Sequence, residues 1–258
     1  MGENILVDKK GPTTIVTINR PQAKNAVDGP TAIELADAFR DFDRDDSASV
    51  AILTGADNTF CAGADLKGVA DGRGNQVRIE GDGPMGPSRM LLSKPVIAAV
   101  EGYAVAGGLE LAAWCDLRVA ATDAVFGVFC RRWGVPLVDG GTIRLTRLLG
   151  TSHAMDLILT GRGVSGDEAQ RIGLANRLCQ PGESLSEAIT LAEQLSNFPQ
   201  MCMRNDRRSA YEQWEHNLPD ALKLETEYGL EVIRSGETRA GAERFASGKG
   251  RHGNFEDL

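Results

Sequence analysis

A strand–helix–strand unit that occurs twice in the first half of the chain is the feature that most constrains the fold. In each copy, a short apolar or β-branched run is followed by a segment with apolar side chains at helical spacing, and then by a second apolar run. The first copy occupies residues 13–18, 31–42 and 49–54, and the second occupies residues 95–100, 106–114 and 117–120. Strands that alternate with helices are typical of a layered α/β core, which the sequence therefore predicts.

The second half of the chain has mostly helical patterns. Ser165 and Glu168 have the spacing of a capping box, in which a serine side chain caps a helix start. Predicted helices cover residues 142–149, 152–159, 167–172 and most of 183–245, with one short strand at 175–179. The last region has too few strands to extend the core, so it packs either against the core or against another subunit. Residues 67–88 are rich in glycine and charge and are predicted to be a surface loop.

The composition excludes several classes of protein. The chain has 258 residues, with 28 basic and 36 acidic side chains, a formal net charge of −8 and a pI near 5.0. Such a charge repels a phosphate backbone, so we expect no nucleic-acid partner. Residues 95–121 are rich in alanine and valine, but Glu101, Glu110 and Asp116 interrupt them, and we expect no membrane span.

Cysteine usage and the N-terminal residues indicate a cytoplasmic protein. The chain has five cysteines, an odd number, with no CxxC pair, and only three histidines. This pattern predicts reduced thiols and no metal site. The first ten residues place charges on both sides of a short apolar run, unlike a secretory signal. Residues 81–86 match the glycine pattern of dinucleotide-binding proteins, but Pro84 and the absence of a preceding buried strand argue against that function.

Two loops rich in small residues follow predicted strands of the core. Residues 60–66 follow the strand at 49–54, and residues 102–110 follow the strand at 95–100. Small side chains leave backbone N–H groups open to a ligand, and the start of a helix favours negative charge. Two such donor sites are what an oxyanion hole for a thioester carbonyl requires. The alternative for the first loop is an ordinary turn into a helix, with Asp65 as its cap.

Three further side chains are candidates for chemistry, each with a structural alternative. Glu110 stands in the first turn of an otherwise apolar helix, where it is either an acid that stabilises the helix dipole on a solvated face or a general acid or base. Cys130 is either a small buried apolar residue or part of a pocket. Asp139 precedes Gly140 and Gly141, so it is either a helix cap or a pocket residue.

Taken together, four segments resemble the crotonase, or enoyl-CoA hydratase/isomerase, superfamily. They are Asn19-Arg20-Pro21 with Asn25-Ala26, LTGADNTFCAGADLK at 53–67, KPVIAAVEGYAVAGGLELAAWCDLRVA at 94–120 and GGTIRLTRLLG at 140–150. The resemblance implies a spiral of ββα repeats with a C-terminal helical region. It also implies that residues 1–192 form the core with an acyl-CoA site and that residues 193–258 form a helical oligomerisation region, assembled as a trimer or a dimer of trimers.

The resemblance also assigns roles within the site. The backbone N–H groups of Ala64 and Gly107 would form the oxyanion hole, and Glu110 matches the first of the two catalytic glutamates of the hydratases. Residues expected to contact the acyl-CoA substrate are Lys24, Ala26, Ala62, Gly63, Asp65, Leu66, Lys67, Gly108 and Cys130. Coenzyme A enters as part of the substrate, and no metal or redox cofactor is implied.

One departure from the family's pattern concerns the second catalytic glutamate. Cys130 occupies that position, and a thiol is a much weaker acid than a carboxyl group. We hypothesise that Glu110 and Asp139 form the acid/base set instead, since Asp139 lies within about one position of a catalytic aspartate in other members of the family. Arg131 and Arg132 either bind an anionic group on the acyl chain or lie on a solvated or intersubunit surface.

The sequence therefore predicts an acyl-CoA enzyme of the crotonase type, nominally an enoyl-CoA hydratase. Because of Cys130, the alternatives are an isomerase, a decarboxylase, a thioester hydrolase or a non-catalytic CoA-binding homologue.

Overall fold

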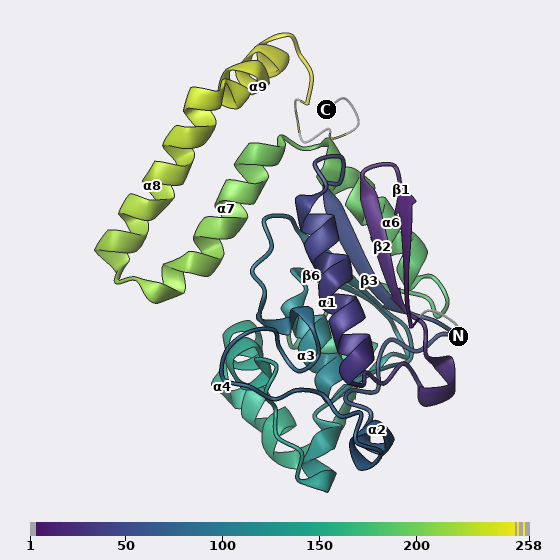
Figure 1. The fold of residues 1–258 in the computed structure, drawn as a ribbon. Coiled ribbons are helices and arrows are strands. Elements are labelled where there is room, and N and C mark those ends of the chain that lie inside the picture. Colours follow the sequence, from purple (N-terminus) through teal and green to yellow (C-terminus); the bar gives the residue numbers. More distant parts are fainter. Residues whose placement is uncertain (1–3, 251, 253–254, 256–258) are drawn as a thin grey trace. The chain divides into compact units, whose positions relative to one another are not determined.

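The computed structural model describes residues 4–250, 252 and 255, and the chain divides into two compact units (Figure 1). The first unit is Met1–Glu193 and the second is Gln194–Leu258. Within the described residues, no helix is both long enough and apolar enough to cross a membrane.

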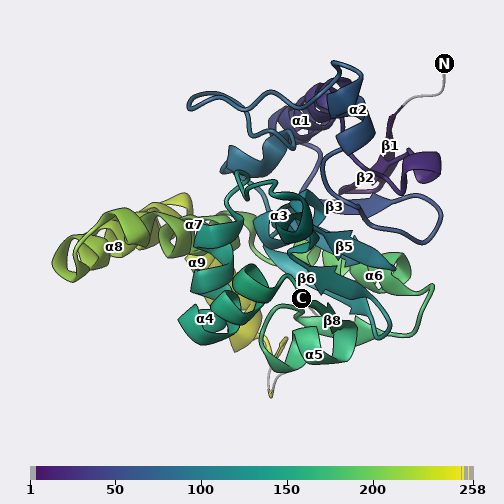
Figure 2. The same cartoon turned by 90° about the horizontal axis from the view of Figure 1, so that it is seen from below.

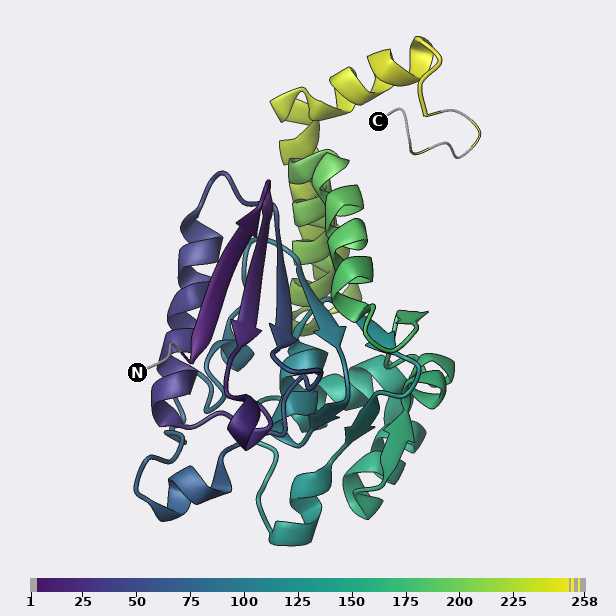
Figure 3. The same cartoon turned by 90° about the vertical axis from the view of Figure 1, so that its right-hand side faces the viewer.

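A twisted six-stranded sheet forms the centre of the first unit (Figure 3). Its strands, in spatial order, are β1 (Ile5–Lys10), β2 (Thr13–Ile18), β3 (Val50–Gly55), β4 (Val96–Val100), β6 (Leu117–Ala121) and β9 (Arg177–Cys179). The first two strands form an antiparallel hairpin, and all later neighbours pair in parallel. The carboxyl ends of parallel strands lie at the same end of the sheet, and ligands of α/β proteins usually bind to the loops there.

A second, three-stranded sheet follows the carboxyl ends of the central strands. It consists of β5 (Tyr103–Val105), β7 (Val125–Gly127) and β8 (Gly163–Ser165), in that order. Figure 2 shows this small sheet beside α5 (Gly166–Arg171), which contacts both β7 and β8. Each strand has only three residues, so the sequence gives no period-2 pattern long enough to predict it.

The helices of the first unit pack on these sheets through apolar faces. The long helix α1 (Gly29–Arg44) begins at its cap Asp28 and buries Leu35 and Phe39 against the hairpin side of the large sheet (Figure 1). All eight residues of α3 (Gly107–Trp114) are buried. The other helical segments are η1 (Pro21–Ala23), α2 (Leu66–Ala70), η2 (Pro87–Arg89), η3 (Phe129–Trp133), α4 (Gly141–Thr160) and α6 (Ser184–Asn197).

Helix α4 is divided by Gly150, whose φ of 70° and ψ of 161° are not helical. The division confirms the two separate helices predicted for residues 142–149 and 152–159. The serine half of the capping box before α5 is confirmed, because the Ser165 side chain accepts a hydrogen bond from the N–H of Glu168. The Glu168 carboxylate instead accepts hydrogen bonds from Arg162.

The described residues of the second unit contain the end of α6, then α7 (Gln200–Glu212), α8 (Leu218–Ser235) and α9 (Glu237–Ala246), with the short η4 (Gln213–Glu215) between α7 and α8. Helices α7 and α8 run back along each other, and the Asn205 side chain donates to the carbonyl of Tyr228 between them. Tyr228 and Val232 are the buried side chains of α8.

Candidate active site

A cavity of about 640 Å³ in the first unit is lined by the segments that follow β3, β4 and β7. Eight of the thirteen residues that the sequence analysis assigned to the site line it: Lys24, Ala62, Ala64, Leu66, Gly107, Glu110, Cys130 and Asp139. Five others are not part of its wall: Ala26, Gly63, Asp65, Lys67 and Gly108. The structure therefore brings the candidate catalytic groups together. Of the five residues outside the wall, Lys67 is exposed and the other four are buried.

The segment around Ala64 presents one backbone donor to this cavity. The N–H of Val27 donates to the carbonyl of Gly63 at 2.8 Å, and the N–H of Asp65 donates to the carbonyl of Val27 at 2.9 Å. Because alternate N–H groups of an extended segment point in opposite directions, the N–H of Ala64 faces away from Val27. No acceptor for it is found within the described part of the chain.

The second donor is created by an unusual backbone conformation before α3. Ala106 has φ 53° and ψ −124°, a combination rare for residues with a side chain. Its own N–H donates to the carbonyl of Gly127 at 2.8 Å, which holds the turn in place. Gly107 is then the first residue of the helix, where N–H groups have no intrahelical acceptor.

The two donor segments touch through a glycine. Gly63 has φ +98°, and a Cβ built on it would lie 2.9 Å from the Cβ of Ala106 and 3.0 Å from the nitrogen of Gly107. A side chain at position 63 would therefore force Ala64 and Gly107 apart. Gly63 acts by allowing this close approach.

Glu110 lies one turn into α3 and is 2% exposed, so the interpretation as a dipole-stabilising acid on a solvated face is wrong. Its Oε1 accepts hydrogen bonds from the N–H groups of Asp139, at 2.9 Å, and Gly141, at 2.8 Å. Burial, and after it the charge of Asp139, raises the pKa of Glu110 to about 7. A carboxyl group with this pKa exchanges its proton near neutral pH, which suits a general acid or base.

Asp139 is also buried, but it does not cap a helix. The cap of α4 is Gly140, whereas the Asp139 Oδ1 accepts from the N–H of Met85 at 2.8 Å and from the hydroxyl of Ser88. The cap interpretation is therefore wrong, because these two donors from a distant segment occupy its carboxylate. Burial raises the pKa of Asp139 above its ordinary value, although the hydrogen bond from Ser88 opposes this.

Cys130 occupies the same cavity and is 6% exposed. Burial, followed by the negative charge of Glu110, raises the pKa of its thiol. The residue is thus both a buried apolar side chain and part of the pocket wall, and the two interpretations of it are compatible.

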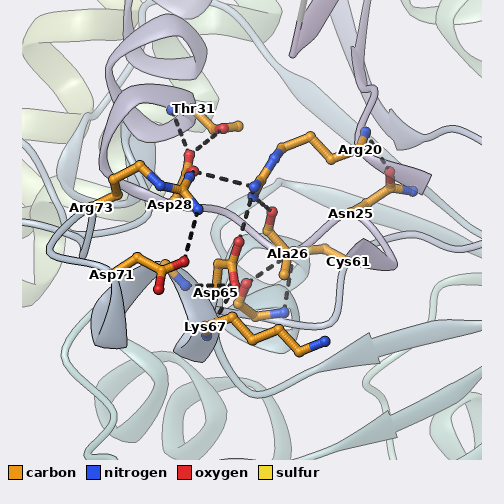
Figure 4. A network of polar contacts seen from close by, with 12 residues as sticks. Arg20, Asn25, Ala26, Asp28, Thr31, Cys61, Asp65, Lys67, Asp71 and Arg73 are labelled. Carbon is orange, nitrogen blue, oxygen red and sulfur yellow. Dashed lines mark hydrogen bonds and ion pairs between the residues drawn. The ribbon is translucent and has the colours of Figure 1, made fainter. Parts of the chain in front are cut away.

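A buried network of charges supports the first donor segment from behind (Figure 4). Arg20 bonds to the Asp65 carboxylate at 2.9 Å, lies 3.2 Å from that of Asp28 and donates to the carbonyl of Ala26. Arg73 reaches Asp28 from the loop after α2. The network ties together two regions that are far apart in sequence, residues 20–28 and residues 65–73.

Asp65 has two structural tasks in this arrangement. Its carboxylate accepts from the N–H groups of Lys67 and Gly68, which confirms the interpretation of Asp65 as a helix cap. Burial favours the neutral acid, but the bonds from Gly68 and Arg20 outweigh it and lower the pKa of Asp65.

Sequence reasoning noted Arg20 only as part of a motif. A signal for its role was the arginine's position at the end of an apolar strand, where a charge requires a partner.

Sequence reasoning also missed most of the apolar wall of the cavity. This wall includes Val69, Met85, Phe129, Trp133, Val135 and Pro136. Val69 comes from the short helix α2, Phe129 and Trp133 come from η3, and the others come from loops. None of these segments is long enough to show a periodic pattern that distinguishes the residues.

Comparisons with known proteins identify the family of the chain. Residues 9–257 match the family model described as enoyl-CoA hydratase/isomerase. The chain is 36% identical to enoyl-CoA hydratase EchA19 of Mycobacterium tuberculosis over 253 residues, which cover 95% of this chain and 94% of that protein. It is also 36% identical to crotonyl-CoA hydratase of Syntrophomonas wolfei over 232 residues, covering 88% of this chain and 89% of that protein.

Solved structures give the same result. A crystal structure of an enoyl-CoA hydratase from Mycobacterium tuberculosis H37Rv superposes with a TM-score of 0.89 at 40% identity, covering 95% of this chain and 96% of that one. The resemblance drawn from the four sequence segments, and the fold class it implied, are confirmed. The chain belongs to the enoyl-CoA hydratase/isomerase family and has the crotonase fold.

Proposed function

We propose that this protein is an enoyl-CoA hydratase, which adds water across the C2–C3 double bond of a 2-enoyl-CoA thioester. The observation that carries the proposal is a pair of buried carboxyl groups, Glu110 and Asp139, in one cavity with the backbone donors of Ala64 and Gly107. The relatives named as hydratases support the same reaction.

In the proposed reaction, the N–H groups of Ala64 and Gly107 bind the thioester carbonyl. Addition at C3 moves negative charge onto that oxygen, so the two donors stabilise the enolate more than the substrate. A donor of this kind contributes about 100- to 1,000-fold to the rate in other enzymes. This step needs only backbone groups, whose positions depend on the absence of side chains at Gly63 and Gly108.

The two carboxyl groups divide the proton transfers between them. Glu110, with a pKa of about 7, holds a proton near neutral pH, whereas the donors from Ser88 and Met85 favour the ionised form of Asp139. We assign Asp139 as the base that takes a proton from water while the oxygen of that water bonds to C3. Glu110 donates its proton to C2, and Asp139 then returns one proton to Glu110.

This assignment explains how a family member works with Cys130 in place of the second glutamate. A thiol whose pKa is raised further by burial stays neutral and weakly acidic at pH 7, so it neither activates water nor supplies a proton readily. Asp139 takes over the missing role from a different position on the wall. The reaction uses no metal or redox cofactor, and coenzyme A is part of the substrate.

We also propose self-association as a trimer or a dimer of trimers, supported by exposed apolar side chains on the second unit. On α8 these include Leu218, Leu222 and Ile233. The cytoplasmic location stays a prediction, consistent with the free thiols of all five cysteines.

The test is the loss of enoyl-thioester absorbance when purified protein is mixed with crotonyl-CoA and longer 2-enoyl-CoAs. We expect turnover by the wild type and a loss of at least about 100-fold in kcat for both Glu110→Gln and Asp139→Asn. Asp123→Asn, at an exposed turn, is the matched control and should keep wild-type activity. In the wild type, kcat/KM should fall as pH rises through about 7, where Glu110 loses its proton.

Two results would contradict the proposal. Full activity in Asp139→Asn would remove Asp139 from the acid/base pair. An inactive wild type that gains hydration in Cys130→Glu would show a natural reaction other than hydration on an intact scaffold.

A further inference from the structure

The two arginines that follow Cys130 differ in where their side chains lie. The Arg131 Nε donates to the carbonyl of Ile158 at 3.0 Å, and its Cβ packs at Gly161, so the side chain is directed to the end of α4. Arg131 is not part of the cavity wall, whereas Arg132 is. Of the two interpretations left open by the sequence, a solvated or structural role fits Arg131, and Arg132 faces the site.

Arg132 carries its charge without a counter-ion in the described part of the chain. Its guanidinium lies over the Phe129 ring at 4.8 Å from the centroid, and its Nε donates to the Phe129 carbonyl at 3.4 Å. No carboxylate of the described residues lies within 4.0 Å of it. The terminal nitrogens, which are its strongest bidentate donors, are therefore available to a ligand.

The surrounding wall makes this cation unusual. Next to it the cavity is lined by Phe129, Trp133, Val135 and Pro136, which offer no charged partner. Arg132 is exposed, so an apolar acyl chain bound here leaves its guanidinium to water and gains nothing from the charge. A carboxylate at the end of the acyl chain would supply two acceptors in the geometry that a guanidinium prefers.

The other charges of the cavity favour one orientation of such a ligand. Among the described residues of the wall, Glu110 and Asp139 are the acids and Lys24 is the one cation besides Arg132. Arg144, outside the wall, is the positive charge that acts on both acids. A second carboxylate on the substrate is repelled by Asp139 and attracted by Arg132. It is therefore directed away from the reacting carbons.

We propose that Arg132 binds the terminal carboxylate of the acyl group, so that the preferred substrates are 2-enoyl-CoA thioesters of dicarboxylic acids. The proposal deepens the proposed function and rests on it for the acyl-CoA ligand. It assigns Arg132 as the residue that selects the substrate, with no part in the proton transfers.

The test measures binding of saturated acyl-CoAs, which need no turnover. Calorimetry would compare pairs of equal chain length: succinyl-CoA with butyryl-CoA, glutaryl-CoA with valeryl-CoA, and adipyl-CoA with hexanoyl-CoA. For at least one pair we expect the wild type to bind the dicarboxylic member about 10- to 100-fold more tightly, as for a charge-assisted hydrogen bond. Arg132→Met should abolish that ratio, and the matched control Arg131→Met should retain it.

The design separates the acyl carboxylate from the phosphates of coenzyme A, because both members of a pair carry the same phosphates. A weaker affinity for free CoA in Arg132→Met, with an unchanged pair ratio, would show that Arg132 binds a phosphate and would overturn the proposal. So would a wild type without preference in any pair. If the preference exists but no 2-enoyl-CoA is hydrated, the proposed function fails while the assignment of Arg132 stands.

Discussion

Glu110 combines two opposing influences in a single side chain. Two N–H groups donate to its Oε1, which favours the ionised form, yet burial and the nearby Asp139 raise its pKa to about 7. The site therefore keeps a carboxyl group in a state that is costly to ionise. Ionisation of Glu110 therefore lowers the free energy of unfolding, because the unfolded chain ionises the same group freely.

Replacing this residue should therefore stabilise the protein at alkaline pH. The pKa of Glu110 is about 7 in the folded protein against an ordinary value of 4.5, so the folded state binds more protons between these values and stability falls as pH rises through them. We compare the free energy of unfolding of Glu110→Gln with that of the wild type. This difference should shift in favour of the variant by about 2–3 kcal/mol between pH 4.5 and pH 8. Urea unfolding at both pH values measures this difference.

The exposed Glu225 provides the control for this experiment, since Glu225→Gln should show no comparable change between the two pH values. If the stability difference between Glu110→Gln and the wild type is the same at both pH values, Glu110 takes up no extra proton in the folded state.

Helix α3 is placed by contacts that leave no room for additional atoms. A Cβ on Gly108 would lie 2.1 Å from the carbonyl oxygen of Cys61, a backbone atom that cannot move aside cheaply. At the other end of the helix, the buried Arg118 donates to the carbonyls of Ala112 and Cys115. The helix start that carries Gly107 is therefore held from both ends.

Gly108→Ala should accordingly destabilise the protein by about 2–4 kcal/mol, the range for a forced shift in a packed core. Gly229→Ala is the matched control, because a Cβ on this α8 residue meets nothing within 4 Å and alanine favours a helix. Thermal unfolding followed by circular dichroism should give a lower Tm for the first variant and an equal or higher Tm for the second. Equal Tm values would show that α3 can move away from the Cys61 carbonyl.

The same elements show which parts of the fold can be predicted from the sequence alone. Long periodic elements such as α1 and the strands of both repeated units were predicted, because their burial produces a pattern along the chain. The three-residue strands β5 and β7, which turn the chain toward Gly107 and Cys130, have no such pattern. Glu110 and Asp139 were identified as candidates, but the contact of Asp139 with Met85 and Ser88 spans more than 50 residues. Only the fold brings these segments together.

At the scale of the whole molecule, α8 has two apolar faces. Tyr228 and Val232 are buried on one, whereas Leu218, Leu222 and Ile233 are 72%, 53% and 59% exposed on another. The spacings of 4 and 11 residues are each close to whole numbers of helical turns, so the exposed three share one face. An exposed apolar stripe of this kind indicates a partner surface.

We expect analytical ultracentrifugation of the wild type to give three or six times 27.6 kDa. Leu222→Asp should shift the protein toward smaller species, because burying an unpaired carboxylate in an interface is costly. Glu227→Lys, which changes the charge on the polar side of α8, should keep the wild-type mass. A monomeric wild type would contradict the predicted assembly.

The charge network around Arg20 links the oxyanion-hole segment to distant parts of the chain. Arg20 and Asp65 are 45 residues apart, and Arg73 joins the network from still further along the chain. A buried guanidinium that loses one of its carboxylate partners is strongly unfavourable. The geometry of the Ala64 donor therefore depends on Arg20, Asp28 and Arg73, side chains that do not line the cavity.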